Sequence, residues 1–487
     1  MKLPPGGRIA IVGAGPSGLA VAKHALEAGF DTTVLETSDD LGGQWHTTAA
    51  HSGVWPGMQT NTSRAMTAFS DFPSPANLPL HPAAEQIHDY LRAYAERFGV
   101  TDRIRLRTTV ERVSAGWDVD GERYDGVVVA SGRFRRPQLP PGLGAFRGEV
   151  LHAFDYAGAD AFRGRRTLVL GNGVSGLEIA SDLARVTAVV SAFRKPRYVI
   201  RKVVDGVSSD WQWYTAFGAL ERQLLSREEL SRTLRARLLR VAGNPADFGA
   251  PEPVDDVLAA GVSLCQDYLA QVADGSIVCR PAVETVAGRT ATFADGSQET
   301  VDAIVCATGY ALDIPYLDAR LRAVLGPGLA LYERTLHPDL AGFGVVGQFL
   351  LQGPYFPLLE LQARWIVALW AGHVAPPDEQ RMRDALIEPP PTDVHNALAA
   401  TLAAELGAAP DLLARPELVE PLLFGPLLPP RYRLDGPGAS PDAAAEFTRQ
   451  LEASPRCAVE PVDVEALRGL GFPREADLVE AALAAKA

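Results

Sequence analysis

The chain of 487 residues is 47% hydrophobic and 22% charged, which is typical of a globular protein with a large core and excludes a disordered or collagen-like chain. Its 46 Lys and Arg against 59 Asp and Glu give a net charge of -13, which disfavours nucleic acid and anionic membrane lipid as partners. The four cysteines, Cys265, Cys279, Cys306 and Cys457, form no CxxC pair and no cluster with histidines, so neither a disulfide framework nor a metal site is expected.

Residues 8–36 have the pattern of a strand, a glycine-rich turn, a helix and a second strand. Residues 8–12 are apolar after Arg8, residues 19–29 have helical periodicity, and residues 32–35 predict the second strand. The turn reads GxGxxG, whose glycines permit a tight turn, a close approach of a pyrophosphate to the helix N-terminus, and close packing of the helix on the sheet. An acid at the end of the second strand is suited to bind a ribose. The predicted dinucleotide site comprises Gly13, Gly15, Pro16, Ser17, Gly18 and Glu36.

A second unit of the same kind follows at residues 167–191. Residues 167–170 predict a strand, residues 177–184 a helix and residues 188–191 another strand. After this last strand come Arg194 and Lys195, and a cation at this point fits the 2′-phosphate of NADP(H) where an acid would repel it. A solvated basic turn is the alternative interpretation of these cations. The residues predicted to bind this second nucleotide are Gly171, Gly173, Val174, Ser175, Gly176, Arg194 and Lys195.

The order of these segments predicts an α/β fold with two Rossmann-like dinucleotide-binding domains, the NADP domain being inserted in the FAD domain. Residues 127–132 and 303–310 each predict a buried strand that closes one of the domains. We therefore expect the first part of the FAD domain at 1–165, the NADP domain at 166–309, and the return to the FAD domain with a C-terminal helical extension at 310–487.

Smaller features complete the predicted elements. Residues 226–240 predict a charged helix, and residues 294–297 a turn between strands. The uncharged residues 340–359 contain several Gly and Pro, so they predict buried strand and turn and not a membrane span. Residues 376–415 predict surface helices and connections without chemistry. The aromatic residues at 211–217 are consistent either with a lid or substrate wall, or with ordinary packing in the core.

Residues 146–156 read FRGEVLHAFDY and fit the pattern FxGxxxHxxx(Y/F) just before the second glycine turn. In this segment, and over nearly its whole length, the chain resembles the flavin-containing monooxygenases, the class B flavoprotein monooxygenases. Further matches lie at 41–45, 61–64, 69–73, 307–310, 331–348 and 423–438, and no hydrophobic anchor follows Gly438, as in a soluble bacterial-type member. Baeyer-Villiger relatives usually carry Trp where Tyr156 stands, so Tyr156 favours the heteroatom-oxygenating branch. His152 is expected to act structurally at the domain hinge.

The resemblance implies FAD and NADP(H) as cofactors and a C4a-hydroperoxyflavin as the oxygenating species. Asn61 lies where the family has a neutral amide beside the flavin, and an amide donor suits this position because a carboxylate would repel developing negative charge. A helix cap is the alternative role for Asn61. The resemblance adds these cofactor-binding residues: Gly43, Gln44, Trp45, Thr62, Ser63, Ser131, Gly132, Thr308, Gly309, Tyr310 and Gln348.

The expected function is therefore NADPH- and O2-dependent oxygenation of a nitrogen or sulfur atom in a small molecule, with a natural-product intermediate as one such substrate. Baeyer-Villiger insertion into a ketone and an uncoupled NADPH oxidase are the alternatives. A flavin-dependent disulfide reductase is disfavoured, because the first cysteine in the chain is Cys265. The expected partners are the substrate and O2, in the cytoplasm, with a homodimer left open. The sequence identifies neither the substrate nor the atom that is oxygenated.

Overall fold

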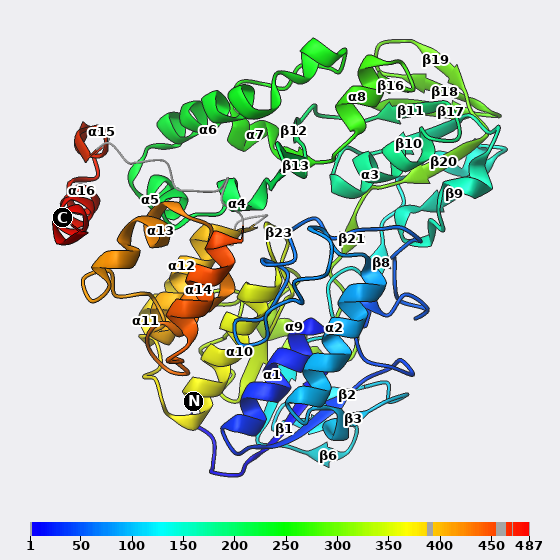
Figure 1. Cartoon of the computed structure of the whole chain (residues 1–487). Coiled ribbons are helices and arrows are strands. Elements are labelled where there is room, and N and C mark those ends of the chain that lie inside the picture. The colour runs from blue at the N-terminus through cyan, green and yellow to red at the C-terminus, as the bar shows by residue number, and fades with distance from the viewer. Residues whose placement is uncertain (1, 387–392, 454–463, 470, 487) are drawn as a thin grey trace.

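The computed structural model describes residues 2–386, 393–453, 464–469 and 471–486. Two parallel five-stranded sheets form the centres of two units, which Figure 1 shows at the bottom and at the upper right. The first sheet has the order β22-β7-β1-β2-β3, made of β1 (Arg8–Val12), β2 (Asp31–Leu35), β3 (Ile104–Arg105), β7 (Gly126–Val129) and β22 (Phe343–Val345). The second has the order β16-β11-β10-β20-β9, made of β9 (Glu149–His152), β10 (Thr167–Leu170), β11 (Val189–Ala192), β16 (Ile277–Arg280) and β20 (Ala303–Cys306).

Both faces of the first sheet are covered, which explains why its central strands β1 and β7 are apolar over residues 9–12 and 126–129. Ile9 and Ile11 of β1 point to the face that carries α1 (Pro16–Glu27) and α10 (Phe356–Ala371). Ala10 and Val12 point to the opposite face. That face is covered by α9 (Ala319–Leu325) and by a small antiparallel sheet of β4 (Val113–Ser114), β5 (Asp118–Val119) and β6 (Glu122–Arg123).

The second sheet is covered in the same way. Val169 of β10 packs in a core with α3 (Val174–Leu183) and α8 (Tyr268–Ala273), whereas Leu168 and Leu170 pack on the other face. A three-stranded antiparallel sheet covers this other face, with β17 (Val283–Ala287), β18 (Thr290–Phe293) and β19 (Gln298–Thr300). The predicted fold class is confirmed: both glycine-rich turns lie between a parallel strand and the helix that follows it.

Helices from the middle and the end of the chain complete the molecule. Between β14 (Val207–Ser208) and β15 (Val262–Leu264) lie α4 (Asp210–Trp213), α5 (Ala216–Leu224), α6 (Arg227–Ala242) and α7 (Val257–Ala260). Helix α6 confirms the predicted charged helix, and Ser226 caps it through a capping box with Glu229. The first unit also contains α2 (Ala84–Arg97), α11 (Glu379–Asp384), α12 (His395–Leu406), α13 (Val419–Phe424) and α14 (Ala443–Glu452), and the last helices are α15 (Val464–Gly469) and α16 (Pro473–Lys486).

Two predictions about these later segments need correction. Residues 340–355 contain strands and turns as expected, but residues 356–359 begin the long buried helix α10. Pro357 lies in the first turn of α10, where its missing N–H has no partner to lose, so this proline starts the helix and does not mark a turn. Helix α12, within the predicted surface region, is largely buried against α10. Residues 387–392 of that region lie outside the described residues.

Strand pairing also bears on the division into domains. Strand β9 precedes the predicted start of the NADP domain at residue 166, yet it pairs in parallel with β20 of the second sheet. The second sheet therefore takes its edge strand from residues 149–152. The division at 165 and 309 stays a prediction.

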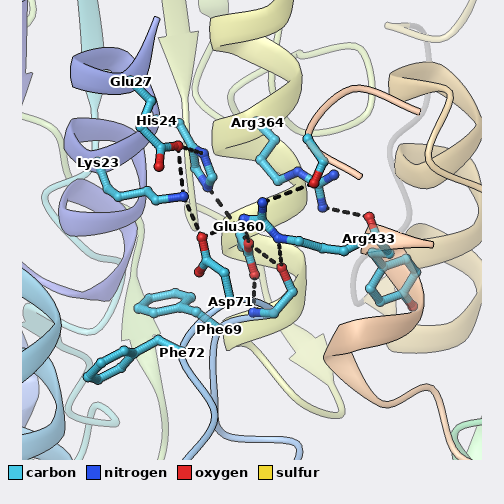
Figure 2. A network of polar contacts seen from close by, with 12 residues as sticks. Lys23, His24, Glu27, Phe69, Asp71, Phe72, Glu360, Arg364 and Arg433 are labelled. Atoms are coloured by element: carbon cyan, nitrogen blue, oxygen red, sulfur yellow. Dashed lines mark hydrogen bonds and ion pairs between the residues drawn. The ribbon is translucent and has the colours of Figure 1, made fainter. Parts of the chain in front are cut away.

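A buried network of charged side chains ties the C-terminal segment to the first unit (Figure 2). Lys23 of α1 forms an ion pair with Asp71, and Arg433 forms ion pairs with Asp71 at 2.7 Å and with Glu360 of α10 at 2.9 Å. Arg364 of α10 also binds the segment around Arg433, because it donates hydrogen bonds to the carbonyl oxygens of residues 432 and 437. Glu360 is 2% exposed and Lys23 is 1% exposed. Because Lys23, Asp71, Glu360 and Arg433 pair with charges of opposite sign and Arg364 is bonded to carbonyl oxygens, the cost of burial is offset only while the whole set is intact.

Candidate active site

A single large cleft lies at the carboxyl ends of the strands of both sheets, where parallel α/β sheets bind their ligands. Its volume is about 2540 Å³. Cavities for a single ligand measure roughly 300 to 1,000 Å³, so this cleft is large enough for more than one ligand. Both glycine-rich turns and both strand ends that follow them line it. The residues therefore come from the two units together.

The backbone of the first glycine-rich turn has the geometry that a dinucleotide requires. Gly13 has φ +107°, and a Cβ atom there would lie 2.7 Å from the carbonyl oxygen of Ala130. A Cβ atom on Gly18 would lie 1.8 Å from the carbonyl oxygen of Gly13, so only glycine lets α1 approach so closely. Gly15 is the N-cap of α1 and provides no side chain to cap it. The first N–H groups of α1 therefore suit a pyrophosphate.

The second turn repeats this geometry. Gly171 has φ +114°, and a Cβ atom on Gly176 would lie 2.1 Å from the carbonyl oxygen of Gly171. Gly173 is the N-cap of α3, again without a side-chain cap. Asn172 donates a hydrogen bond to the carbonyl oxygen of Lys195 at 2.6 Å. This bond holds the exposed basic pair beside the turn, in the cleft.

Glu36 lines the cleft and is 4% exposed. Its two carboxylate oxygens accept hydrogen bonds from the backbone N–H of Ala14 at 2.7 Å and of Ser38 at 2.8 Å. The side chain thus braces the first glycine-rich turn against the end of β2. Each oxygen keeps lone pairs for a further donor, so the predicted contact with a ribose stays a prediction that this geometry permits.

Most of the predicted cofactor-binding residues line the cleft, and three do not. Those that line it, besides the residues already described, are Pro16, Ser17, Gly43, Gln44, Trp45, Thr62, Ser131, Gly132, Val174, Ser175, Thr308, Gly309 and Tyr310. Gly18 packs inward against the sheet, and Ser63 is fully buried. Gln348 is 6% exposed, and its amide N and O both have no hydrogen-bond partner in the described chain. A buried amide of this kind needs a partner, which a ligand held by the adjacent turns would supply.

Asn61 is exposed and lines the cleft. No helix in the described part of the chain begins at this residue, so the interpretation of Asn61 as a helix cap is wrong. The amide of Asn61 is thus directed by the loop of residues 60–63 and not by a helix terminus. Its role toward a cofactor stays a prediction.

His152 and Tyr156 lie where the chain enters the second unit. Nε2 of His152 is 3.0 Å from the carbonyl oxygen of Gly309, and its Nδ1 accepts from the backbone N–H of Phe154 at 3.0 Å. Burial lowers the pKa of His152. The buried Tyr156 donates its hydroxyl to Asp182 at 2.7 Å. These contacts join the end of β9 to the segment after β20 and to α3, all within the second unit. The predicted role of His152 at a domain hinge stays a prediction.

The aromatic residues at 211–217 divide between the two predicted roles. Trp211 is 7% exposed and belongs to the core, and Phe217 packs against Phe424 with the ring centroids 5.2 Å apart. Trp213 and Tyr214 instead line the cleft. The segment therefore contributes both to packing and to the wall of the cavity.

The polar residues of the cleft that the sequence did not single out include Arg133, Asp210 and Asn396. Nε of Arg133, Oδ1 of Asp210 and Oδ1 of Asn396 are buried without a hydrogen-bond partner in the described chain. Burial lowers the pKa of Arg133 and raises that of Asp210. Two of these residues could have been found from the sequence. Arg133 directly follows a Ser-Gly pair at the end of a strand, and Asp210 is the sole charged residue between 206 and 220. Asn396 left no signal in the sequence.

Cysteine chemistry is not a feature of this cleft. Burial raises the pKa of Cys265 and of Cys306 to about 11, which leaves both as thiols at neutral pH. Cys457 lies outside the described residues. Within the described ranges no group of three or more His, Cys, Asp or Glu is arranged to hold a metal ion, and no helix is long and apolar enough to span a membrane.

Comparison with known proteins defines the class of enzyme. A sequence model of the flavin-binding monooxygenase-like proteins matches residues 6–456. The chain belongs to the flavin-binding monooxygenase-like family. It is 30% identical over 478 residues to the N-oxide-forming dimethylaniline monooxygenase 2 of Cavia porcellus, a match that covers 88% of this chain and 89% of the relative. The predicted family and a flavin as cofactor are thereby confirmed.

Solved structures of this family share the fold. S-allyl-L-cysteine S-oxygenase from Allium sativum is similar with a TM-score of 0.63 and 21% identity, covering 97% of this chain and all 100% of that one. Cyclohexanone monooxygenase from Rhodococcus sp. Phi1 bound to NADP+ is similar with a TM-score of 0.59 and 17% identity, covering 83% of this chain and 97% of that one. At these identities the likeness shows the two-unit fold alone.

Proposed function

We propose that the chain is an NADPH- and O2-dependent flavin monooxygenase that oxygenates a nitrogen or sulfur atom of a small molecule. The observation that carries this proposal is that both glycine-rich turns, the basic pair Arg194 and Lys195, and Asn61 all line one cleft. FAD, when bound, supplies the redox chemistry by accepting hydride and activating O2. The remaining work of binding, orientation and exclusion of water belongs to the residues of the chain.

Each group in the cleft has a proposed task. The N-termini of α1 and α3 bind the two pyrophosphates, Glu36 binds a ribose of FAD, and the cations after β11 bind the 2′-phosphate of NADPH. Asn61 donates its amide N–H near the reacting oxygen without adding a negative charge. Trp213 and Tyr214 present aromatic surface to the cleft, which excludes water from the site.

The choice of nitrogen or sulfur is supported by relatives whose names state such reactions: one is N-oxide-forming and another is an S-oxygenase. Tyr156 supports the same choice, because Baeyer-Villiger relatives usually carry Trp at this position. Insertion of oxygen into a ketone is the competing outcome. A cytoplasmic location remains part of the proposal.

A substrate panel tests this function directly. NADPH consumption is measured with N,N-dimethylaniline, an oxime, S-allyl-L-cysteine and cyclohexanone, while oxygenated product and hydrogen peroxide are quantified in parallel. We expect an N-oxide or an S-oxide to form in proportion to NADPH consumed. A lactone as the sole product would replace the proposal with Baeyer-Villiger chemistry, and peroxide as the sole product would reduce it to an NADPH oxidase.

The role of Asn61 is tested by Asn61→Ala, with Asn77→Ala as the matched control, since Asn77 is exposed outside the cleft. Loss of one donor to developing negative charge costs roughly 2.7 to 4 kcal/mol, so we expect product per NADPH to fall at least about ten-fold. FAD content and flavin reduction by NADPH should stay within a few-fold of the unmodified protein. Unchanged product yield in Asn61→Ala would remove Asn61 from the chemistry.

A further inference from the structure

The loop that carries Asn61 is held from behind by a segment of the inserted unit. Asp210 begins α4 and accepts, at its Oδ2, hydrogen bonds from the backbone N–H of Ser63 at 2.7 Å and from the Ser63 hydroxyl at 2.8 Å. Nε1 of Trp211 donates to the same hydroxyl at 2.9 Å. Asp210 is 5% exposed and Ser63 is 0% exposed. The contact is therefore shielded from water, where hydrogen bonds to a carboxyl group are strongest.

His81 fixes the other side of the same loop. Its Nδ1 lies 3.1 Å from the carbonyl oxygen of Thr60, and its Nε2 lies 3.2 Å from the hydroxyl of Ser208. The hydroxyl of Thr60 donates to the carbonyl oxygen of Thr62 at 2.8 Å. The backbone is thus held immediately before and after Asn61, while the Asn61 side chain itself is exposed in the cleft.

Packing alone does not account for a carboxyl group at residue 210. The neighbouring Trp211 belongs to the apolar core, and an acid buried there costs free energy unless its hydrogen bonds repay it. Here the bonds to Oδ2 both come from one residue of the Asn61 loop, whereas Oδ1 has no partner in the described chain. The carboxyl group therefore binds this loop through Oδ2, and the hydroxyl of Ser208, which also contacts His81, helps to stabilise its charge.

The contact also joins the two halves of the cleft. Residues 208–211 follow the strand and basic turn of the second glycine-rich unit in the chain, whereas residues 60–63 belong to the first unit. Any displacement of the second unit relative to the first acts on the Asn61 loop through this contact. No other residue with a charged side chain lies between 206 and 220 to take its place.

We propose that Asp210 is a positioning residue for Asn61: through Ser63 it fixes the loop that carries the amide, and so it makes the yield of oxygenated product depend on how the inserted unit is seated. This inference rests on the proposed function. Oδ2 of Asp210 is bound by Ser63, whereas its Oδ1 has no partner in the described chain and Asp210 lines the cleft. A direct contact of Oδ1 with a ligand would act independently of Asn61, and the double-mutant cycle distinguishes that route from the proposed one.

The decisive variants are Asp210→Ala, which removes both bonds to Ser63, and Asp210→Asn, whose amide oxygen can still accept them. The matched control is Asp255→Ala, because Asp255 is an exposed acid of the same unit that does not line the cleft. In the FAD-bound protein we expect Asp210→Ala to retain its flavin and a KM for NADPH within two-fold. Product per NADPH should fall roughly ten-fold with a matching rise in peroxide, Asp210→Asn should recover most of the yield, and Asp255→Ala should match the unmodified protein.

A double-mutant cycle shows whether the effect passes through Asn61. If it does, adding Asp210→Ala to Asn61→Ala lowers the product yield no further. Multiplicative losses in the double variant, or an unchanged yield in Asp210→Ala, would overturn the inference. If Asp210→Ala is insoluble, product yield is compared between Asp210→Asn, which keeps both bonds to Ser63, and Ser63→Ala, which removes one of the two bonds.

Hydrogen exchange separates failure of this inference from failure of the proposed function. The amides of residues 60–63 should exchange at least about ten-fold faster in FAD-bound Asp210→Ala than in Asp255→Ala. This readout needs no substrate, so it stands even if no compound of the panel is oxygenated. Equal exchange in the two variants would show that Asp210 does not hold the loop.

Discussion

The two glycine-rich turns have similar backbone conformations but differ in the segments that pack against them. A Cβ atom on Gly15 would lie 3.5 Å from Cα of Gly43, because a second glycine-containing segment closes over the first turn. A Cβ atom on Gly173 would meet no atom within 4 Å. The first turn is thus enclosed between two segments of backbone, whereas the second opens toward the cleft.

The charges behind the two turns differ in extent. Behind the first, α1 carries Lys23 into the buried network that includes Arg433 and Glu360. Behind the second, α3 carries a partly buried pair, Glu178 with Lys202, whose side chains are 20% and 7% exposed. The hairpin after β17 carries an exposed pair, Arg289 with Asp302, whose side chains are 58% and 33% exposed. If the proposed function holds, we expect the same sequence motif to serve two kinds of site, with a firmly held nucleotide in the first and an exchangeable one in the second. This difference can be tested by matched substitutions in the two units.

The largest effect is expected from the buried network. Arg433→Met leaves Asp71 and Glu360 without their common cation, and breaking a buried pair from one side costs about 3 to 5 kcal/mol of unfolding free energy. The matched change in the second unit, Arg289→Met, removes an exposed pair worth about 0 to 1 kcal/mol. Denaturant titration of the FAD-bound proteins measures both. Equal losses in the two variants would contradict the distinction between the units.

The pH dependence of stability gives a second readout of the same network. Burial alone would raise the pKa of Glu360, but His24, whose Nε2 lies 3.7 Å from the carboxylate, and the charges of Arg433 and Arg364 hold the pKa well below the ordinary value of 4.5. A carboxyl group with a lowered pKa in the folded state contributes stability above its unfolded pKa, and loses it as the pH falls through the folded value. We therefore expect the stability of the unmodified protein to fall more steeply below pH 4.5 than that of Arg433→Met.

The next effect concerns the turns themselves. Gly15→Val adds a branched side chain where the pyrophosphate is proposed to approach the backbone, and steric conflict of this kind costs about 1 to 3 kcal/mol, or roughly 5 to 150-fold in FAD affinity. Gly173→Val should leave FAD content unchanged and weaken only NADPH binding. Flavin absorbance per polypeptide after gel filtration measures the first effect. Stoichiometric FAD in Gly15→Val would show that the first turn does not hold the flavin nucleotide.

The parts of this site that local patterns encode were predictable from the sequence, and the parts made by long-range contacts were not. In the first unit the two strands, the glycine-rich turn between them and Glu36 follow one another within about thirty residues, so their spacing alone identifies the unit. The bond between Asp210 and Ser63 joins residues 147 positions apart, and no periodicity predicts it. The burial of α12 likewise depends on its contact with α10.

The smallest effect is expected from substitutions in the basic turn after β11. Arg194 and Lys195 are exposed, so water partly screens each contact with a 2′-phosphate. The free energy of each contact should therefore be near 1.5 kcal/mol, the low value for a charge-assisted hydrogen bond, which corresponds to roughly ten-fold in KM for NADPH. We expect Arg194→Ala and Lys195→Ala each to raise KM for NADPH by that factor and to leave KM for NADH almost unchanged, because NADH has no 2′-phosphate. Arg201→Ala is the control, since Arg201 is an exposed cation of the same stretch that does not line the cleft. Flavin content should stay constant in all three variants, because the first turn holds its nucleotide without these residues. Equal use of NADPH and NADH by the unmodified protein would show instead that the pair is a solvated basic turn, and that the second site is open to either nucleotide.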